Sequence, residues 1–212
     1  MTEVYLMTSA EIYDIDNLIT IHNRDSKLIT SEKAILSVSG EKEAEELSKN
    51  KSLQGFDAIY SSNYVRTLET AKYIALENNT VIHIDDRFNE RIIGNLEPME
   101  VSELRVLQAK NFDFKLPNGE SLNEVKKRSQ KALKELLSNE IGNKVLILSH
   151  PITIMAILTT WCEMGFNFEA DMILSYNDKT IVDSNFNFSN IIKLEFEDTN
   201  LVNVDSIDYK DI

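Results

Sequence analysis

The sequence predicts an α/β protein, a three-layer α/β/α sandwich with a mainly parallel central sheet. Short apolar runs of strand type alternate with longer amphipathic stretches of helix type along most of the chain. The run Val145-Leu146-Ile147-Leu148 is continuously apolar, which is typical of a central strand buried on both faces. Strands separated by helices form parallel sheets with right-handed crossovers, so helices are expected on both faces of this sheet.

Short apolar runs bounded by polar or turn-forming residues are predicted as strands. They are Val4–Met7, Asp57–Tyr60, Val81–Ile84, Lys144–Ser149, Met172–Ser175, Ile191–Phe196 and Leu201–Val204. Stretches with apolar residues at helical spacing are predicted as helices. They are Gly40–Lys49, Tyr64–Glu77, Pro98–Lys110, Ser121–Asn139 and Ile152–Met164. Ser121 and Glu124 form an S/T-x-x-E capping box at the start of one of them. The segment Glu11–Val38 is polar and rich in Asp and Asn, so it is predicted to be irregular.

Composition limits the classes of function. The 212 residues, with only 3 prolines and 6 glycines, fit a single domain over residues 1–212 that buries a substantial core. The net charge of −13 disfavours nucleic acid and anionic membranes as partners. The same charge repels phosphate at long range, so a phosphate site in this chain needs local positive charge.

Several features favour a cytoplasmic protein. The single cysteine, Cys162, lies in an apolar helical stretch and is expected to be a buried core residue in a reducing compartment. The N-terminus has no cationic start followed by an apolar run, so no secretory signal is expected. The most apolar segment, Ile152–Trp161, is too short to span a bilayer. Three scattered histidines give no metal-ligand spacing, so neither a metal nor a cofactor is predicted.

Candidate functional residues follow the predicted strands. Ser61 and Ser62 end one strand, and Arg66 lies in the first turn of the next helix, where free backbone N–H groups and a guanidinium can hold an anion. His150 follows the central strand and could bind phosphate or carry a proton. Glu90, in the loop after the third strand, is a candidate acid or base. Ligands of parallel sheets bind beyond the carboxyl ends of the strands, so these residues are expected to converge there.

Each of these residues also has a simpler interpretation. Arg66 could belong to an ordinary capped helix and extend into water. His150 could be a hydrogen-bonded structural histidine. Glu90 could be a solvated loop carboxylate. His83 alternates with two isoleucines on a predicted strand and is most simply an exposed or edge side chain.

Taken in order, these segments resemble the histidine phosphatase superfamily, the phosphoglycerate-mutase-like group. Val4–Glu11 lies where that family has a strand followed by Arg-His-Gly-Glu, and Ser61–Ala71 is similar to its S-S-x-x-x-R-x-x-x-T-A motif. Glu90 and Gly94 fit E-x-x-x-G, Pro117–Ser121 matches P-x-G-E-S, and Leu148-Ser149-His150 is similar to the late strand with its histidine. The resemblance covers nearly the whole chain, and it implies that residues 95–120 form a cap-like insertion facing the substrate.

The resemblance implies a role for each site residue. In that family a histidine of the first motif accepts the phosphoryl group, arginines and a second histidine clamp it, and a carboxylate handles protons. By position, Arg66 and His150 would be phosphate ligands, and Glu90 the acid or base. The nucleophile position, however, holds Ser9, and the first clamp position holds Thr8. Ala10 replaces the motif glycine, and Pro151 stands where the family commonly has glycine.

These departures predict that ordinary phosphohistidine turnover is lost. A serine hydroxyl is a far weaker nucleophile than imidazole unless a base activates it, and a threonine cannot replace a charge-assisted arginine contact worth about 1.5–3 kcal/mol. A relocated nucleophile is conceivable at His22, with Arg24 nearby, but in-line attack demands accurate placement.

Three functions remain open on the sequence alone. The favoured one is a pseudoenzyme that binds a phosphorylated small molecule or a protein partner without turnover. The second is a hydrolase or phosphotransferase rebuilt around Ser9 or water as nucleophile, with His150 and Glu90 as base and acid. The third is a structural or interaction protein with a vestigial pocket. The sequence names neither the ligand nor the oligomeric state.

Overall fold

The structure is a computed structural model that describes residues 1–13, 31–169 and 171–207. A six-stranded sheet in the order β3-β2-β4-β1-β8-β9 forms its centre. Strands β1 (Thr2–Thr8), β2 (Ala58–Ser61), β3 (Ile82–Ile84) and β4 (Lys144–Ser149) are parallel to one another. Strands β8 (Ile191–Glu197) and β9 (Asn200–Ile207) add to the β1 edge in antiparallel orientation. The predicted mainly parallel sheet is therefore confirmed.

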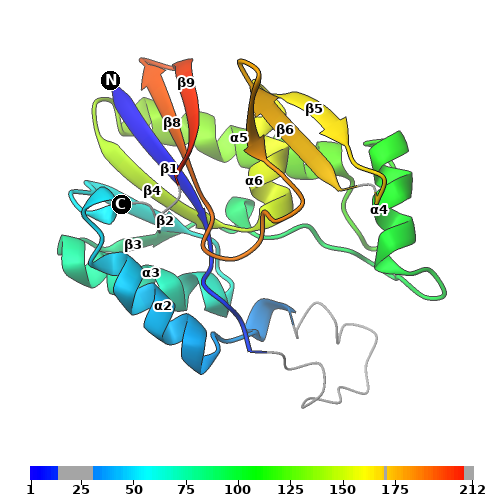
Figure 1. Ribbon diagram of the computed structural model, residues 1–212, viewed down its shortest axis with the longest axis horizontal. Helices are drawn as coiled ribbons and strands as arrows, with labels where there is room; N and C mark the ends of the chain where they lie inside the picture. The colour runs from blue at the N-terminus through cyan, green and yellow to red at the C-terminus, as the bar shows by residue number, and fades with distance from the viewer. Residues whose placement is uncertain (14–30, 170, 208–212) are drawn as a thin grey trace.

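Helices cover both faces of the sheet, as Figure 1 shows. Helices α2 (Val38–Ser48) and α3 (Val65–Asn78) lie on one face, and α5 (Leu122–Asn139) and α6 (Pro151–Leu158) lie on the other. Alternate residues of β4 enter the two apolar clusters: Val145 and Ile147 face α5 and α6, whereas Leu146 and Leu148 face α2 and α3. This strand is buried on both faces, as its continuous apolar run predicts.

Helix α5 begins where the sequence predicts, because its capping box forms. Ser121 Oγ accepts from the Glu124 N–H at 3.1 Å, and the Glu124 carboxylate accepts from the Ser121 N–H at 2.9 Å. The apolar stripe of the helix packs on the sheet. Its buried members are Leu122, Val125, Ala132, Leu133, Leu136 and Leu137.

The predicted helix Ile152–Met164 is wrong at its C-terminal end. Helix α6 stops at Leu158, because the hydroxyls of Thr159 and Thr160 donate to the Ala156 and Ile157 carbonyls and end the helical ladder. Residues Glu163–Phe166 instead form β5, which pairs with β6 (Met172–Tyr176) in a small antiparallel sheet. The third strand of that sheet, β7 (Lys179–Val182), was not predicted from the sequence.

Residues 95–120, predicted to be a cap-like insertion, carry the short helix α4 (Val101–Lys110). The helix lies at the end of the molecule opposite β2 and β3, beside β5 (Figure 1). A small apolar cluster of its own, centred on Leu96, Leu104 and Leu116, holds it. Pro98 precedes the helix rather than opening it, and follows a cis peptide bond.

The two glycines of the matched loop motifs hold this segment against the rest of the protein. Gly94 has φ = +84°, and a Cβ there would lie 2.6 Å from the Gly119 nitrogen. A Cβ on Gly119 would collide with the Ile93 carbonyl. The two loops also exchange backbone hydrogen bonds, Asn95 N–H to the Pro117 carbonyl at 2.9 Å and Glu120 N–H to the Ile92 carbonyl at 2.8 Å. Both glycines are therefore needed for close backbone approach.

Candidate functional site

The strand ends bring the predicted site residues together. Thr8 pairs with Ser149 in the parallel register, so Ser9 and His150 leave the sheet side by side. Ser62 follows β2 on the other side of β4, where its N–H donates to the Leu148 carbonyl at 3.0 Å. Thr8, Ser9, Ser62 and His150 are all buried. His22 and Arg24 lie outside the described residues.

Ser9, which the sequence resemblance assigns to the nucleophile position, is held by its backbone. Its carbonyl accepts from the Ser189 N–H at 2.9 Å, while Thr8 Oγ1 accepts from the Asn190 N–H at 2.9 Å. The threonine hydroxyl thus links the end of β1 to the loop before β8, which is a structural role. Within the described parts of the chain, Ser9 Oγ makes no hydrogen bond to His150 or to any other base.

Arg66 is buried, with only 9% of its surface exposed, so the interpretation as a solvated arginine is wrong. Its Nη1 donates to the Ser31 carbonyl at 2.5 Å, and its Nη2 donates to His150 Nδ1 at 2.9 Å. The guanidinium carbon lies 4.9 Å from the centre of the Tyr64 ring, a cation–π distance. Burial lowers the pKa of Arg66, and the neighbouring Glu90 carboxylate opposes that shift.

The proton of His150 can be placed from its partners. Arginine only donates, so His150 Nδ1 must be the acceptor, and Nε2 carries the hydrogen. Nε2–H then donates to Ser62 Oγ at 2.8 Å. The Thr67 hydroxyl donates to the Tyr64 carbonyl at 2.8 Å, so the Ser62 hydroxyl donates to Thr67 Oγ1, also at 2.8 Å. Both ring nitrogens of His150 are engaged within the protein.

This environment keeps His150 neutral. The side chain is 1% exposed, and its ring lies 4.7 Å from the Tyr64 ring, centre to centre. Burial, followed by the positive charges of Arg66 and Arg128, holds the pKa of His150 well below 6.5. A neutral imidazole whose lone pair already faces Arg66 cannot take a proton from Ser9 without giving up that contact.

Glu90 is half-buried beside these groups rather than free in water. Its carboxylate accepts from the Arg91 N–H at 2.8 Å, and weakly from the Thr153 hydroxyl and the Ile152 N–H, each at 3.4 Å. Thr153 also donates to the Asn89 carbonyl at 2.7 Å. The start of α6 therefore fixes the loop that carries Glu90 close to His150.

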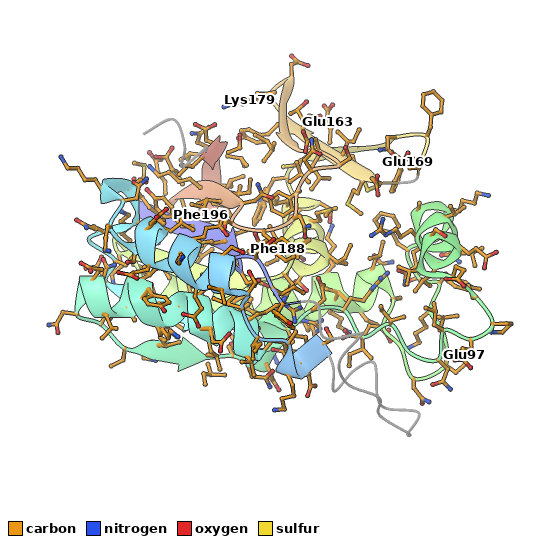
Figure 2. All side chains as sticks on the ribbon, turned by 60° about the horizontal axis from the view of Figure 1, so that its bottom comes forward. Glu97, Glu163, Glu169, Lys179, Phe188 and Phe196 are labelled. Carbon is orange, nitrogen blue, oxygen red and sulfur yellow. The ribbon has the colours of Figure 1, made fainter. Side chains whose placement is uncertain are left out.

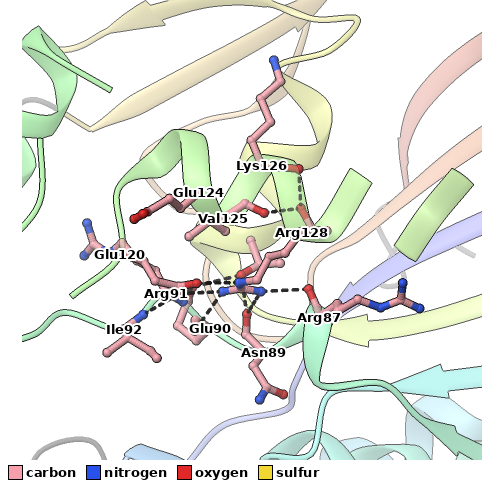
Figure 3. Close-up of polar contacts among 12 residues, drawn as sticks. Arg87, Asn89, Glu90, Arg91, Ile92, Glu120, Glu124, Val125, Lys126 and Arg128 are labelled. Carbon is pink, nitrogen blue, oxygen red and sulfur yellow. Dashed lines mark hydrogen bonds and ion pairs between the residues drawn. The ribbon is translucent and has the colours of Figure 1, made fainter. Parts of the chain in front are cut away.

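Arg128 is a site residue that the sequence did not reveal. From α5, it donates to the carbonyls of Arg87 and Asn89 at 2.8 and 2.9 Å, and to that of Glu90 at 3.3 Å. Its other edge forms a bidentate pair with Glu120, at 2.7 and 2.9 Å (Figure 3). Arg128 follows two lysines in the sequence and has the pattern of a solvated helix face. No local signal separates it from those neighbours.

Exposed acidic side chains lie on the loop before α4 and on the small sheet. Figure 2 shows Glu97 on the loop before α4, and Glu163 and Glu169 on the outside of the small sheet. All three side chains are exposed. Among the described residues, no group of three His, Cys, Asp or Glu side chains could hold a metal ion. None of the described helices is both long and apolar enough to span a membrane.

The sequence of the chain is similar to that of a known protein family. The profile of the histidine phosphatase superfamily (branch 1) matches residues 20–189, a span that begins after Thr8-Ser9-Ala10. The chain is 29% identical over 168 residues to the probable phosphoglycerate mutase GpmB of Enterobacter sp. (strain 638), covering 76% of this chain and 74% of that protein. The corresponding protein of Serratia proteamaculans (strain 568) is 28% identical over 168 residues, with the same coverage.

Solved structures agree on the fold. A phosphoglycerate mutase from Bacillus anthracis str. Sterne superposes with a TM-score of 0.68 over 99% of this chain and 94% of that chain, at 13% identity. A mycobacterial glucosyl-3-phosphoglycerate phosphatase superposes with a TM-score of 0.67 over 96% of this chain and 97% of that chain, at 14% identity.

Proposed function

We propose that this chain, which belongs to the histidine phosphatase superfamily, is a pseudoenzyme that binds a phosphorylated ligand without phosphohistidine turnover, because its resemblance to the family assigns Ser9 to the nucleophile position. The observation that carries the proposal is the closed set of contacts around His150. Arg66 occupies one ring nitrogen and Ser62 the other, and Ser9 has no base bonded to it within the described chain.

Arg66 supplies the attraction for phosphate. It is a buried cation that makes no ion pair with the described carboxylates, and its strongest contact is the neutral Ser31 carbonyl. Replacing that carbonyl with a phosphate oxygen would turn a neutral hydrogen bond into a charge-assisted one, about twice as strong. The N-terminus of α3 supports the same role, because Tyr64 at its N-cap position provides no side-chain cap for the free N–H groups.

The first test is hydrolysis of a panel of phosphomonoesters by purified protein, with the His150→Ala variant as the contamination control. We expect no turnover above that control. Turnover that His150→Ala and Ser9→Ala each abolish would instead establish a rebuilt serine mechanism and overturn the proposal.

The second test is thermal stabilisation by inorganic phosphate. At about ten times the dissociation constant, binding to the folded state raises the melting temperature by about 3 °C for a chain of this length. Arg66→Met should remove the rise. Arg105→Met is the matched control, because Arg105 is half exposed and paired with Asp171. A rise that survives in Arg66→Met would place the anion elsewhere, and no rise in the wild type would favour a vestigial pocket.

A further inference from the structure

A cavity of about 270 Å³ lies next to the groups that hold Arg66. Glu32, which lines this cavity, directly follows Ser31, the residue whose carbonyl accepts from Arg66. Tyr64 also lines it, and the centre of the Tyr64 ring lies 4.9 Å from the guanidinium carbon of Arg66. A ligand whose phosphate binds Arg66 would therefore place its organic part at the edge of this cavity.

Two arginines line the cavity, and carboxylates already neutralise both. Arg128 forms its bidentate pair with Glu120, and its remaining N–H groups donate to three carbonyls (Figure 3). Arg87 pairs with Asp85 at 2.7 Å and with Glu135 at 2.5 Å. Neither arginine therefore supplies the cavity with an unneutralised positive charge.

Three further carboxylates line the cavity without an ion pair to a described residue. They belong to Glu32, Asp86 and Glu90. The carboxylates of Glu32 and Asp86 accept no hydrogen bond from a described residue, and that of Glu90 accepts only from two backbone N–H groups and the Thr153 hydroxyl. Negative charges gathered around one cavity repel one another and attract a cation.

The Tyr64 hydroxyl is an independent indication of a ligand. Tyr64 is 2% exposed, yet its hydroxyl makes no hydrogen bond with a described residue. Among the described side chains, the polar atoms that are both sealed and unpartnered are Arg91 Nε and Ser189 Oγ, so the Tyr64 hydroxyl is open to the cavity that this residue lines. Burial, followed by the Glu32 carboxylate, raises the pKa of Tyr64 to about 12, so the phenol stays neutral. Hydroxyls of buried side chains normally have a partner, which a ligand N–H would supply here.

We propose that the phosphorylated ligand of this site is an aminoalkyl phosphate, whose phosphate pairs with Arg66 and whose primary ammonium group lies in the cavity. The ammonium contacts the three carboxylates, and one of its N–H groups donates to the Tyr64 hydroxyl. The inference rests on the function proposed above, because Arg66 holds the phosphate. A phosphate ester that carries a carboxylate in place of the ammonium would be repelled by the cavity.

The test compares phosphoethanolamine with ethyl phosphate, which has the same phosphate and two carbons but no ammonium, by calorimetric titration of the full chain. We expect phosphoethanolamine to bind about tenfold more tightly, as a charge-assisted hydrogen bond predicts. Glu32→Gln/Asp86→Asn should reduce this ratio to about twofold or less, while ethyl phosphate binds equally well or more tightly because less negative charge repels it.

The matched control is Glu163→Gln/Glu169→Gln. It removes the same two charges from exposed side chains of the small sheet, which do not line the cavity (Figure 2). The preference for phosphoethanolamine should survive in this variant. If Glu32→Gln/Asp86→Asn fails to fold, Asp86→Asn alone provides the comparison, because Asp86 is exposed, and it should lower the ratio about threefold.

The outcomes separate this inference from the function on which it rests. Equal binding of the two esters by the wild type would overturn the aminoalkyl ligand and leave phosphate binding in place. An unchanged ratio in Glu32→Gln/Asp86→Asn, or in a folded Asp86→Asn used alone, would also overturn the inference. Binding of neither ester would overturn the inference and the proposed function together.

Discussion

At the residue scale, two arginines of this region, Arg66 and Arg91, are buried. Arg66 contacts a neutral imidazole and a backbone carbonyl, whereas Arg91 contacts one side-chain amide. In a chain with a net charge of −13, buried cations without carboxylate partners are exceptional. Burial lowers the pKa of both arginines, and the nearby Glu90 carboxylate opposes that shift in both.

His150 should make stability depend on pH. In the unfolded chain it takes up a proton near pH 6.5, whereas in the fold its pKa lies well below 6.5. The unfolded state therefore binds more protons below pH 6.5, and the free energy of unfolding should fall by up to about 1.4 kcal/mol per pH unit towards about pH 5. Urea unfolding across this range measures the slope.

The control compares the pH dependence of the free energy of unfolding in His150→Gln with that in His83→Gln. His83 is exposed on the edge strand β3, as the sequence predicts. Only His150→Gln should flatten the slope. Equal slopes in the wild type and His150→Gln would mean that His150 is not held neutral in the fold.

At the element scale, residues of the two matched loop motifs hold loops in place. Glu120 of the P-x-G-E-S match pairs with Arg128, which in turn holds the three carbonyls before and at Glu90. Gly94 and Gly119 let the same two loops pack backbone against backbone. The position of Glu90 thus depends on α5 as much as on its own loop.

Arg128→Lys should destabilise the protein by about 2–3 kcal/mol, because a lysine cannot reproduce a bidentate pair together with three carbonyl contacts in this partly buried place. Urea unfolding provides the measurement, and Arg105→Lys, at a half-exposed ion pair, is the control with an expected change below about 0.5 kcal/mol. A similar small change in Arg128→Lys would show that the arginine fork does not hold the loop.

Gly94→Ala and Gly119→Ala should each cost about 2 kcal/mol or more, since the added Cβ meets backbone atoms. Gly142→Ala is the control that measures the cost of a positive φ without a collision between the added Cβ and the backbone. Gly142 also has a positive φ, +82°, but has open space around it, so only about 1 kcal/mol is expected there. Thermal or urea unfolding of the three variants measures the free energy of unfolding that each substitution costs. Equal costs at all three positions would rule out close approach as the reason.

At the scale of the whole molecule, α4 and its small apolar cluster adjoin the core through the two loops and through Gln108. The sequence predicts one domain, and a single domain unfolds as a unit. The only tryptophan, Trp161, packs against Phe196 at 5.8 Å between ring centres, so its fluorescence reports on the core rather than on α4.

Leu104→Ala tests whether α4 and the core unfold together as one cooperative unit. Leu104 is buried in the α4 cluster, and its truncation should cost about 2–4 kcal/mol. If the chain is one cooperative unit, Trp161 fluorescence and circular dichroism will show the same lowered midpoint. Val106→Ala, at a more exposed site on α4, should have little effect. A Leu104→Ala transition that leaves the fluorescence midpoint unchanged would mean that residues 95–120 unfold separately.

The sequence by itself determined the order of strands and helices from β1 to the start of α6, the central strand Lys144–Ser149 and the start of α5 at Ser121, because these depend on residue periodicity and local capping. It also placed Ser9 and His150 at strand ends and Arg66 in the first turn of the helix that follows β2. Only the tertiary structure decided that Arg66 and Ser62 close around His150, that Arg128 clamps the Glu90 loop, and that Arg91 is buried beside a cavity. Those contacts join residues far apart in the chain, and they follow from strand register and helix packing, which no local pattern encodes.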